Sequence, residues 1–243
     1  ISPPPPPPPP FAHTHNTEHK TDVCFPTHCA GPWPMQVLRA YARGSALLAL
    51  GCTEAGQVEV LRLAEAAKRV PAGLSDQTQI ANLVLSAGMD LHVNGDNEAA
   101  IAKLWAALDV QVSFGYSEPP SWHQPVRDCL GQVLLDSGDP EGAESVFRAS
   151  LQDFTESAFS LWGLRAALRA QHPGREAEDA DDLDERIAAA WAHADVELVG
   201  SCPMFMQHAG RGSQRRRALC RPYSKQSVVH PPGTLLDLKA AAA

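Results

Sequence analysis

The sequence predicts an all-α protein built from repeated helical hairpins, and three observations lead to this prediction. Ala and Leu are abundant while Val and Ile are sparse, a composition that favours helices. Glycines recur in pairs seven residues apart, and successive pairs lie 44 and 43 residues apart, so the chain carries an internal repeat. Apolar residues at helical spacing follow each pair. The pairs are Gly44 with Gly51, Gly88 with Gly95, and Gly131 with Gly138.

The first glycine of each pair is expected inside a first helix, where a second helix approaches so closely that a Cβ would obstruct it. The second glycine is expected to end that helix in a left-handed cap. Twelve residues after the first glycine stands a small residue, and four further on a large one. The small residues are Gly56, Ala100 and Ala143, and the large ones are Val60, Leu104 and Phe147.

The start of each second helix is marked by the stretches CTEAG (52–56), DNEAA (96–100) and DPEGA (139–143). We expect an N-cap from the hydroxyl or carboxylate at the head of each stretch. Pro140 occupies the first helical position, where its missing N–H does no harm. The expected caps are Thr53, Asp96 and Asp139, and the glutamates that complement the helix dipole are Glu54, Glu98 and Glu141.

The hairpin at 124–157 resembles the tetratricopeptide repeat, a helix-turn-helix unit of about 34 residues. It departs from that family at Arg127 and Thr155. Segments 37–70 and 81–114 match more loosely, and 158–195 keeps the apolar spacing of Leu161, Leu164 and Leu168 without the glycine pair. The signature residues of the best copy are Leu130, Gly131, Leu134, Gly138, Ala143, Phe147 and Leu151. The resemblance implies a right-handed α-solenoid over 36–200, between disordered segments at 1–35 and 201–243.

The stretches YSEPPSWHQPVRDCLGQVLL and SLWGLRAAL resemble the C-terminal portion of an uncharacterised class of large tetratricopeptide-repeat proteins with the signature YxEPPxW…PxRxxLG. The resemblance covers roughly 36–205. It implies that Pro119 and Pro120 stiffen a linker between hairpins, while Tyr116 and Trp122 pin it against adjacent helices. Pro125 is expected in the first turn of the next helix. This spacer explains why successive repeats lie about 43 residues apart rather than the 34 of the tetratricopeptide repeat.

The two ends of the chain differ from the repeats in composition. Residues 3–10 are eight prolines, which predict a disordered polyproline end or, alternatively, a ligand for an aromatic-lined groove of the SH3 type. A group of metal-ligating side chains follows, and it leaves open a metal-binding protein or an enzyme, although the spacing matches no standard zinc site. These residues are His13, His15, His19, Cys24, His28 and Cys29.

Charge is distributed unevenly along the chain, whose net charge is -8. From Met206 onward the sequence has seven basic residues and a single acidic one, Asp237. The part before Met206 is therefore strongly acidic. An acidic body repels phosphates, so nucleic acid is not the expected partner, although binding through the basic tail stays an alternative. No run of 18 apolar residues occurs, and a membrane partner is not expected.

Six cysteines are scattered without a CxxC pair. In a chain of this length with no visible secretory signal, they predict reduced thiols and a cytoplasmic protein, with Cys129 as a buried, inert thiol. The six are Cys24, Cys29, Cys52, Cys129, Cys202 and Cys220.

The common catalytic motifs are missing from the sequence: no GxSxG, GxxxxGK[ST] or HExxH is present. Glu118 with His123, and His92 with Asp90 or Asp96, are interpreted as surface groups rather than acid-base pairs. The acidic run at 177–185 lacks the glycine turn of a calcium loop. The prediction is therefore a non-catalytic protein without a cofactor.

The resemblance implies instead that the first helices line a concave groove for a protein or peptide partner. Residues at the carboxylate-clamp places are not lysine or asparagine, which disfavours the acidic C-terminal tail of chaperones as ligand. Asp128 and Asp136 favour a basic or neutral ligand, and Trp162 is the best candidate anchor. The groove positions are Tyr41, Ser45, Asn82, Leu85, Met89, His92, Asp128, Gln132, Asp136, Phe159, Trp162 and Arg169.

Overall fold

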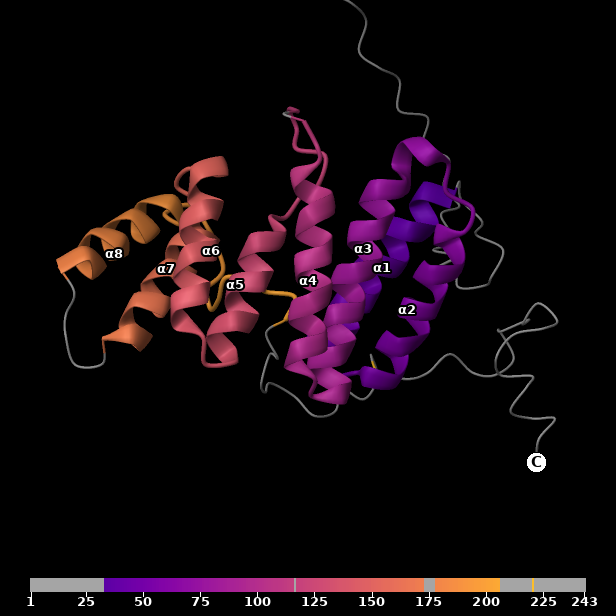
Figure 1. Ribbon diagram of the computed structural model, residues 1–243, viewed down its shortest axis with the longest axis horizontal. Helices are drawn as coiled ribbons and strands as arrows, with labels where there is room; N and C mark the ends of the chain where they lie inside the picture. The colour runs from indigo at the N-terminus through magenta and orange to yellow at the C-terminus, as the bar shows by residue number, and fades with distance from the viewer. Residues whose placement is uncertain (1–32, 116, 173–177, 206–219, 221–243) are drawn as a thin grey trace, which may run out of the picture. The chain divides into compact units, whose positions relative to one another are not determined.

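A computed structural model describes residues 33–115, 117–172, 178–205 and 220, all of which belong to one unit of the chain. Within these ranges the chain forms eight α-helices and no strand, so the all-α prediction is confirmed (Figure 1). A 3₁₀ turn, Ala72–Leu74, precedes α3, and a π turn, Asp90–Asn94, continues it. The helices are α1 (Trp33–Ala49), α2 (Thr53–Ala67), α3 (Ser75–Met89), α4 (Asn97–Val112), α5 (Val126–Asp136), α6 (Pro140–Asp153), α7 (Ala158–Gln171) and α8 (Glu178–Ala190).

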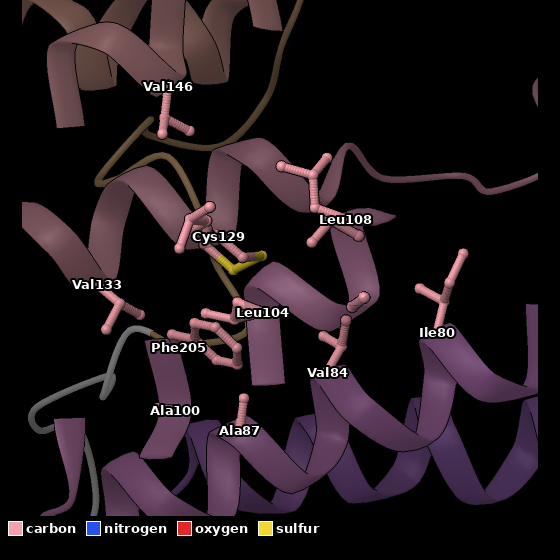
Figure 2. Packing of buried hydrophobic residues seen from close by; sticks show 14 of the residues in the cluster. Ile80, Val84, Ala87, Ala100, Leu104, Leu108, Cys129, Val133, Val146 and Phe205 are labelled. Atoms are coloured by element: carbon pink, nitrogen blue, oxygen red, sulfur yellow. A yellow bond between two sulfur atoms is a disulfide. The ribbon is translucent and has the colours of Figure 1, made fainter. Parts of the chain in front are cut away.

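Helices that follow one another pack as hairpins: α1 against α2, α3 against α4, α5 against α6, and α7 against α8. The first helices of neighbouring hairpins also touch, α1 against α3 and α5 against α7. Buried side chains of all eight helices join in one hydrophobic cluster, part of which Figure 2 shows. None of the helices in the described ranges is long and apolar enough to cross a bilayer.

Each predicted turn between the paired helices contains its glycine in the left-handed region. The φ angles of Gly51, Gly95 and Gly138 are 72°, 65° and 85°, conformations that L side chains adopt only at a cost. Asp96 and Asp139 cap the following helices by accepting the N–H groups of Ala99 and Gly142, each at 2.9 Å. The cap expected from Thr53 is wrong, because Cys52 occupies the N-cap position of α2 and its side chain makes no capping bond.

Two of the three glycines inside first helices lie against their second helix as predicted. A Cβ on Gly131 would come 2.5 Å from Cζ of Phe147 in α6. One on Gly44 would come 3.2 Å from Cβ of Glu59 in α2, but Leu85 of α3 lies closer, at 2.8 Å. Gly88 differs, since its nearest neighbours are Leu48 of α1, at 3.2 Å, and Phe205, at 3.3 Å. The approach at Gly88 therefore involves the end of the described chain rather than α4.

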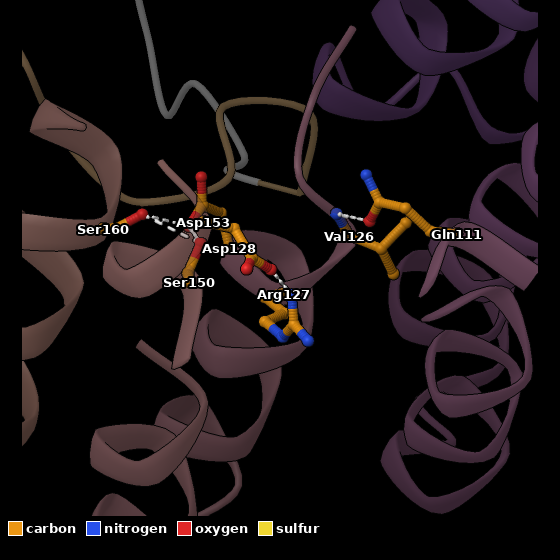
Figure 3. A network of polar contacts seen from close by, with 7 residues as sticks. All are labelled: Gln111, Val126, Arg127, Asp128, Ser150, Asp153 and Ser160. Carbon is orange, nitrogen blue, oxygen red and sulfur yellow. Dashed lines mark hydrogen bonds and ion pairs between the residues drawn. The ribbon is translucent and has the colours of Figure 1, made fainter. Parts of the chain in front are cut away.

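The linker before α5 is pinned by an aromatic contact, as expected for Trp122. Its side chain is buried and meets Tyr41 of α1 edge to face, with ring centroids 5.3 Å apart. Pro125 stands at the N-cap, one residue before α5 begins. The amide N–H at the start of α5, that of Val126, donates to Oε1 of Gln111 at 2.8 Å (Figure 3). Tyr116 lies outside the described residues.

At least one ion pair connects the two halves of every hairpin in the described ranges. Glu59 of α2 is buried and lies 3.1 Å from Nε of Arg43 in α1. The other three hairpins are joined by Asp90 with Lys103, Arg127 with Asp153, and Arg165 with Asp184. Asp90 is buried in this pair, which corrects its interpretation as a surface group.

Two disulfides contradict the prediction of reduced thiols. Cys52 is bonded to Cys220 and Cys129 to Cys202, across sequence separations of 168 and 73 residues. Such separations hide the pairing in the sequence, because only the folded chain brings these Cα atoms to 5.0 and 4.7 Å. Cys129 is buried as expected, but it is a disulfide sulfur and not a thiol.

Candidate functional site

A short segment of the chain after α8 lies on the first helices, where the sequence predicts a partner-binding groove. We call residues 200–205 the docked segment, and we call the surface it covers the α3–α5 face, which is formed by Gly88, His92, Asp128, Gln132 and Cys129. Gly200, Ser201, Cys202 and Phe205 are buried. The sequence predicts a disordered tail from residue 201, which is wrong for residues 201–205, because Cys202 and Phe205 belong to the hydrophobic core and Ser201 is buried beside them.

Gln132 provides the polar recognition of the docked segment. Its Oε1 accepts the backbone N–H of Ser201 at 3.1 Å and lies 3.0 Å from Oγ of Ser201. Its Nε2 donates to Oδ1 of Asp136 at 3.0 Å, which fixes the amide orientation. Oγ of Ser201 also lies 3.1 Å from the carbonyl oxygen of Asp128. Three predicted groove positions, one helical turn apart on α5, thus form a single network with a segment that begins 69 residues after Gln132.

The Cys129–Cys202 disulfide fixes the middle of the docked segment to α5 covalently. The sulfur atoms lie beside Nε2 of Gln124, at 3.7 and 3.9 Å. After it, the backbone turns back at Pro203, and the N–H of Phe205 donates to the carbonyl of Cys202 at 3.0 Å. Proline at the second position of such a turn is favoured because its φ angle is already fixed.

Phe205 anchors the end of the docked segment. Its ring meets the His92 imidazole edge to face, with centroids 6.4 Å apart. The ring also lies 3.3 Å from the position that a Cβ on Gly88 would take, and it belongs to the same buried cluster as Ala87 and Leu104 (Figure 2). A side chain at position 88 would therefore press against this ring.

The Asp128 carboxylate lies beneath the network and does not face solvent. Its Oδ1 accepts hydrogen bonds from Ser160 at 2.6 Å and from Ser150 at 3.0 Å, so α5, α6 and α7 meet at this residue (Figure 3). Burial raises the pKa of Asp128 to about 6, against the lowering effect of the two serine hydroxyls. All three side chains are fully buried and link the three helices.

The remaining groove positions are used within the fold to different degrees. Tyr41 is buried against Trp122, and Ser45 donates to the carbonyl of Tyr41 at 2.8 Å. Arg169 pairs with Asp184 of α8 at 2.9 Å. Leu85 is buried; the half-buried positions are Asn82, Met89, Phe159 and Trp162, and Trp162 has the Arg165 guanidinium 6.0 Å from its ring centroid.

Burial also affects the acid-base groups that the sequence brings to attention. It lowers the pKa of His92 and raises that of Asp136, the latter against a hydrogen bond from Gln132. In the part of the chain that the structure describes, no three His, Cys, Asp or Glu side chains form a group that could hold a metal ion. The His/Cys cluster from His13 to Cys29 and the basic tail from Met206, apart from Cys220, lie outside these residues.

Sequence reasoning missed Ser201, Cys202 and Phe205, which complete the α3–α5 face. The only signal was the stretch GSCPMF itself, in which a turn-forming proline stands between a cysteine and an aromatic residue.

Comparison with known proteins adds no assignment. The chain matches no protein-family model, and neither curated proteins nor solved structures give a match.

Proposed function

We propose that the chain is a non-catalytic scaffold or adaptor of the tetratricopeptide-repeat type, which binds a peptide or helix of another protein on the inner face of a helical solenoid. The first helices α1, α3, α5 and α7 would line that face. The unidentified partner would be a basic or neutral segment, because Asp136 is exposed at its border.

One observation carries the proposal: a segment of the chain's own polypeptide, residues 200–205, already rests on the α3–α5 face. Gln132 accepts a backbone N–H of that segment at 3.1 Å, a contact that any residue except proline can supply. Phe205 packs closely against Gly88, with its ring 3.3 Å from the position that a Cβ there would take. A backbone acceptor next to an aromatic pocket is the combination by which grooves of this kind hold short peptides.

The contacts of the docked segment also indicate which ligands would fit. A ligand needs a free backbone N–H opposite Gln132 and an aromatic side chain four residues later, the separation between Ser201 and Phe205. Tryptophan, tyrosine and phenylalanine give large contact area for little loss of side-chain freedom, so we expect one of these at the anchor position.

A peptide-display selection on the full chain, kept in a dithiol reductant, tests the proposal. We expect selected peptides to share one aromatic residue and to lose at least tenfold in affinity for the Gln132→Leu variant, because the apolar side chain cannot accept the backbone N–H. The matched control is Gln152→Leu, an exposed position of α6 outside the α3–α5 face.

The two variants must have the same helix content by circular dichroism for the comparison to count. A selection that yields no peptide, or peptides that bind Gln132→Leu and wild-type chains equally well, would refute a peptide-binding function of this face.

A further inference from the structure

The docked segment has the properties of a ligand held in place by a covalent bond. It contributes a backbone N–H to Gln132, and after a turn at Pro203 it places an aromatic ring beside Gly88 and His92. The disulfide between Cys129 and Cys202 stands between these two contacts. A second polypeptide therefore cannot occupy the α3–α5 face while this segment is seated.

We propose that residues 200–205 are an intramolecular ligand of the α3–α5 face and that the Cys129–Cys202 disulfide is a thiol-controlled latch which decides whether an external peptide of the same pattern can bind. This inference rests on the proposed function and goes beyond it, because it names the occupant, the recognised pattern and the control. The pattern is a backbone N–H donor followed four residues later by an aromatic side chain.

The physical reason for a latch is the high local concentration of a tethered ligand. A segment attached to the same chain competes at an effective concentration in the millimolar range. A disulfide restricts it further, since departure of the segment would require the bond to break. Once the bond is reduced, the segment is held only by noncovalent contacts, and an external peptide can compete with it.

Opening the latch is a balanced exchange with a dithiol. One thiolate of the reductant attacks a sulfur of the disulfide, forming a mixed disulfide and expelling the other cysteine as a thiolate. The second thiol of the reductant then displaces the remaining cysteine. Two electrons and two protons pass to Cys129 and Cys202, and the reductant leaves as a cyclic disulfide.

Burial of both sulfurs adds a kinetic condition to this exchange. Cys202 is fully buried and Cys129 nearly so, and an attacking thiolate must approach along the S–S axis. The docked segment must therefore open locally before the bond can be cut. We expect reduction of the latch to be slower than that of a solvent-exposed disulfide and to accelerate in low, non-denaturing urea.

The test measures binding of a fluorescent peptide with the sequence of residues 199–206, in which a Cys202→Ser exchange prevents covalent capture. Three full-length chains are compared: the oxidised wild type, the wild type in dithiothreitol, and the triple variant Cys129→Ser/Cys202→Ser/Phe205→Ala, whose own segment is weakened. The control chain is Cys52→Ser/Cys220→Ser, which loses the other disulfide and keeps the latch. A peptide with Phe205→Ala is the control ligand.

We expect the peptide to bind the triple variant and the reduced wild type at least tenfold more tightly than the oxidised wild type and the control chain, and the control peptide to bind none of them. Equal binding to oxidised and opened chains would overturn the latch while leaving the proposed function standing. No binding to opened chains that keep their helix content would overturn residues 200–205 as a ligand, whatever the display selection finds.

If the triple variant loses its helix content, hydrogen exchange on the wild type decides the question. On reduction, amide exchange at 200–205 must rise while exchange in α6 stays unchanged. Unchanged exchange at 200–205 overturns the latch.

Discussion

Asp128 shows how a single residue can tie three helices together at an electrostatic cost. Its carboxylate joins α5 to Ser150 of α6 and to Ser160 of α7 in a buried place. Two hydroxyl donors do not replace the hydration that an ionised carboxylate loses, so burial raises the pKa. The same residue also accepts Ser201 through its backbone carbonyl, which couples this cluster to the docked segment.

The first prediction concerns the pH dependence of stability at Asp128. A pKa raised from 3.8 to about 6 means that the folded state favours the protonated carboxyl. Its stabilising effect is fully present below pH 3.8 and is lost as the pH rises through about 6, so the free energy of unfolding should fall across this window by up to about 3 kcal/mol. In Asp128→Asn this fall should be absent, and urea unfolding at pH 4, 6 and 8 would measure it.

The control for this experiment is Glu98→Gln, an exposed change in α4 that leaves Asp128 in place and should keep the wild-type slope. If the free energy of unfolding of Asp128→Asn fell with pH as steeply as that of the wild type, Asp128 would not be the cause of the pH dependence.

The second prediction concerns the close approach at Gly131. In Gly131→Ala the new Cβ would lie 2.5 Å from Cζ of Phe147, and overpacking of this kind costs about 1 to 3 kcal/mol. Gly73→Ala is the matched control, because nothing lies within 4 Å of its Cβ position. Thermal unfolding of both variants measures the effect, and we expect Gly73→Ala to be neutral or slightly stabilising. Equal effects of the two changes would contradict the packing argument.

At the scale of elements, three devices recur among the hairpins, although not every hairpin uses all of them. A left-handed glycine ends the first helix in three of the four, an ion pair connects the two helices in all four, and an aspartate caps the second helix in two. The hairpin of α1 and α2 uses Cys52 at the cap position instead, without a side-chain cap. Its disulfide to Cys220 therefore holds a helix start that no side chain caps.

The third prediction compares two helix starts that look alike in the sequence. Asp139→Ala should lower the free energy of unfolding by about 1 kcal/mol, because the N–H of Gly142 loses its acceptor. Thr53→Ala should have a much smaller effect, since Thr53 is the first residue inside α2 and not its cap. Chemical denaturation of both variants gives the comparison, and a Thr53→Ala loss as large as that of Asp139→Ala would argue against the cap assignment.

For the whole molecule, two long-range disulfides connect the end of the described chain with its first and third hairpins. The loops that they close, 168 and 73 residues, restrict the unfolded chain strongly, by roughly 4 to 5 kcal/mol each in the chain-entropy description. The two disulfides bind different parts of the helical region: Cys52 lies between α1 and α2, and Cys129 lies in α5. Reduction should therefore affect the two regions separately.

The fourth prediction is a disulfide map of the oxidised chain. Tryptic digestion without reductant should yield residues 128–148 linked to 187–211, and residues 44–62 linked to 218–225. Both linked pairs should separate into single peptides after reduction, which mass spectrometry detects directly. Linkage of 44–62 to 187–211 would contradict the pairing seen in the structure.

Local features of the fold could be predicted from the sequence, and features that depend on distant contacts could not. Gly51, Asp96 and Pro140 act through neighbours a few residues away, so spacing alone places them. Gly88 was predicted to face its own second helix, but it packs against Phe205, which lies 117 positions further along the chain. The candidate site was predicted on the helical side only, because periodicity says nothing about which segment returns to cover it.

The Cys129–Cys202 bond can form only after Cys202 has been synthesised, so the order of synthesis matters for this face. Helix α5 leaves the ribosome before Cys202 has been made, and at 5 to 20 residues per second the 73 residues between them take roughly 4 to 15 s. During this interval Cys129 has no Cys202 to pair with. If residues 200–205 are the intramolecular ligand that we propose, a newborn chain would accept an external peptide that the finished chain excludes, without any reductant.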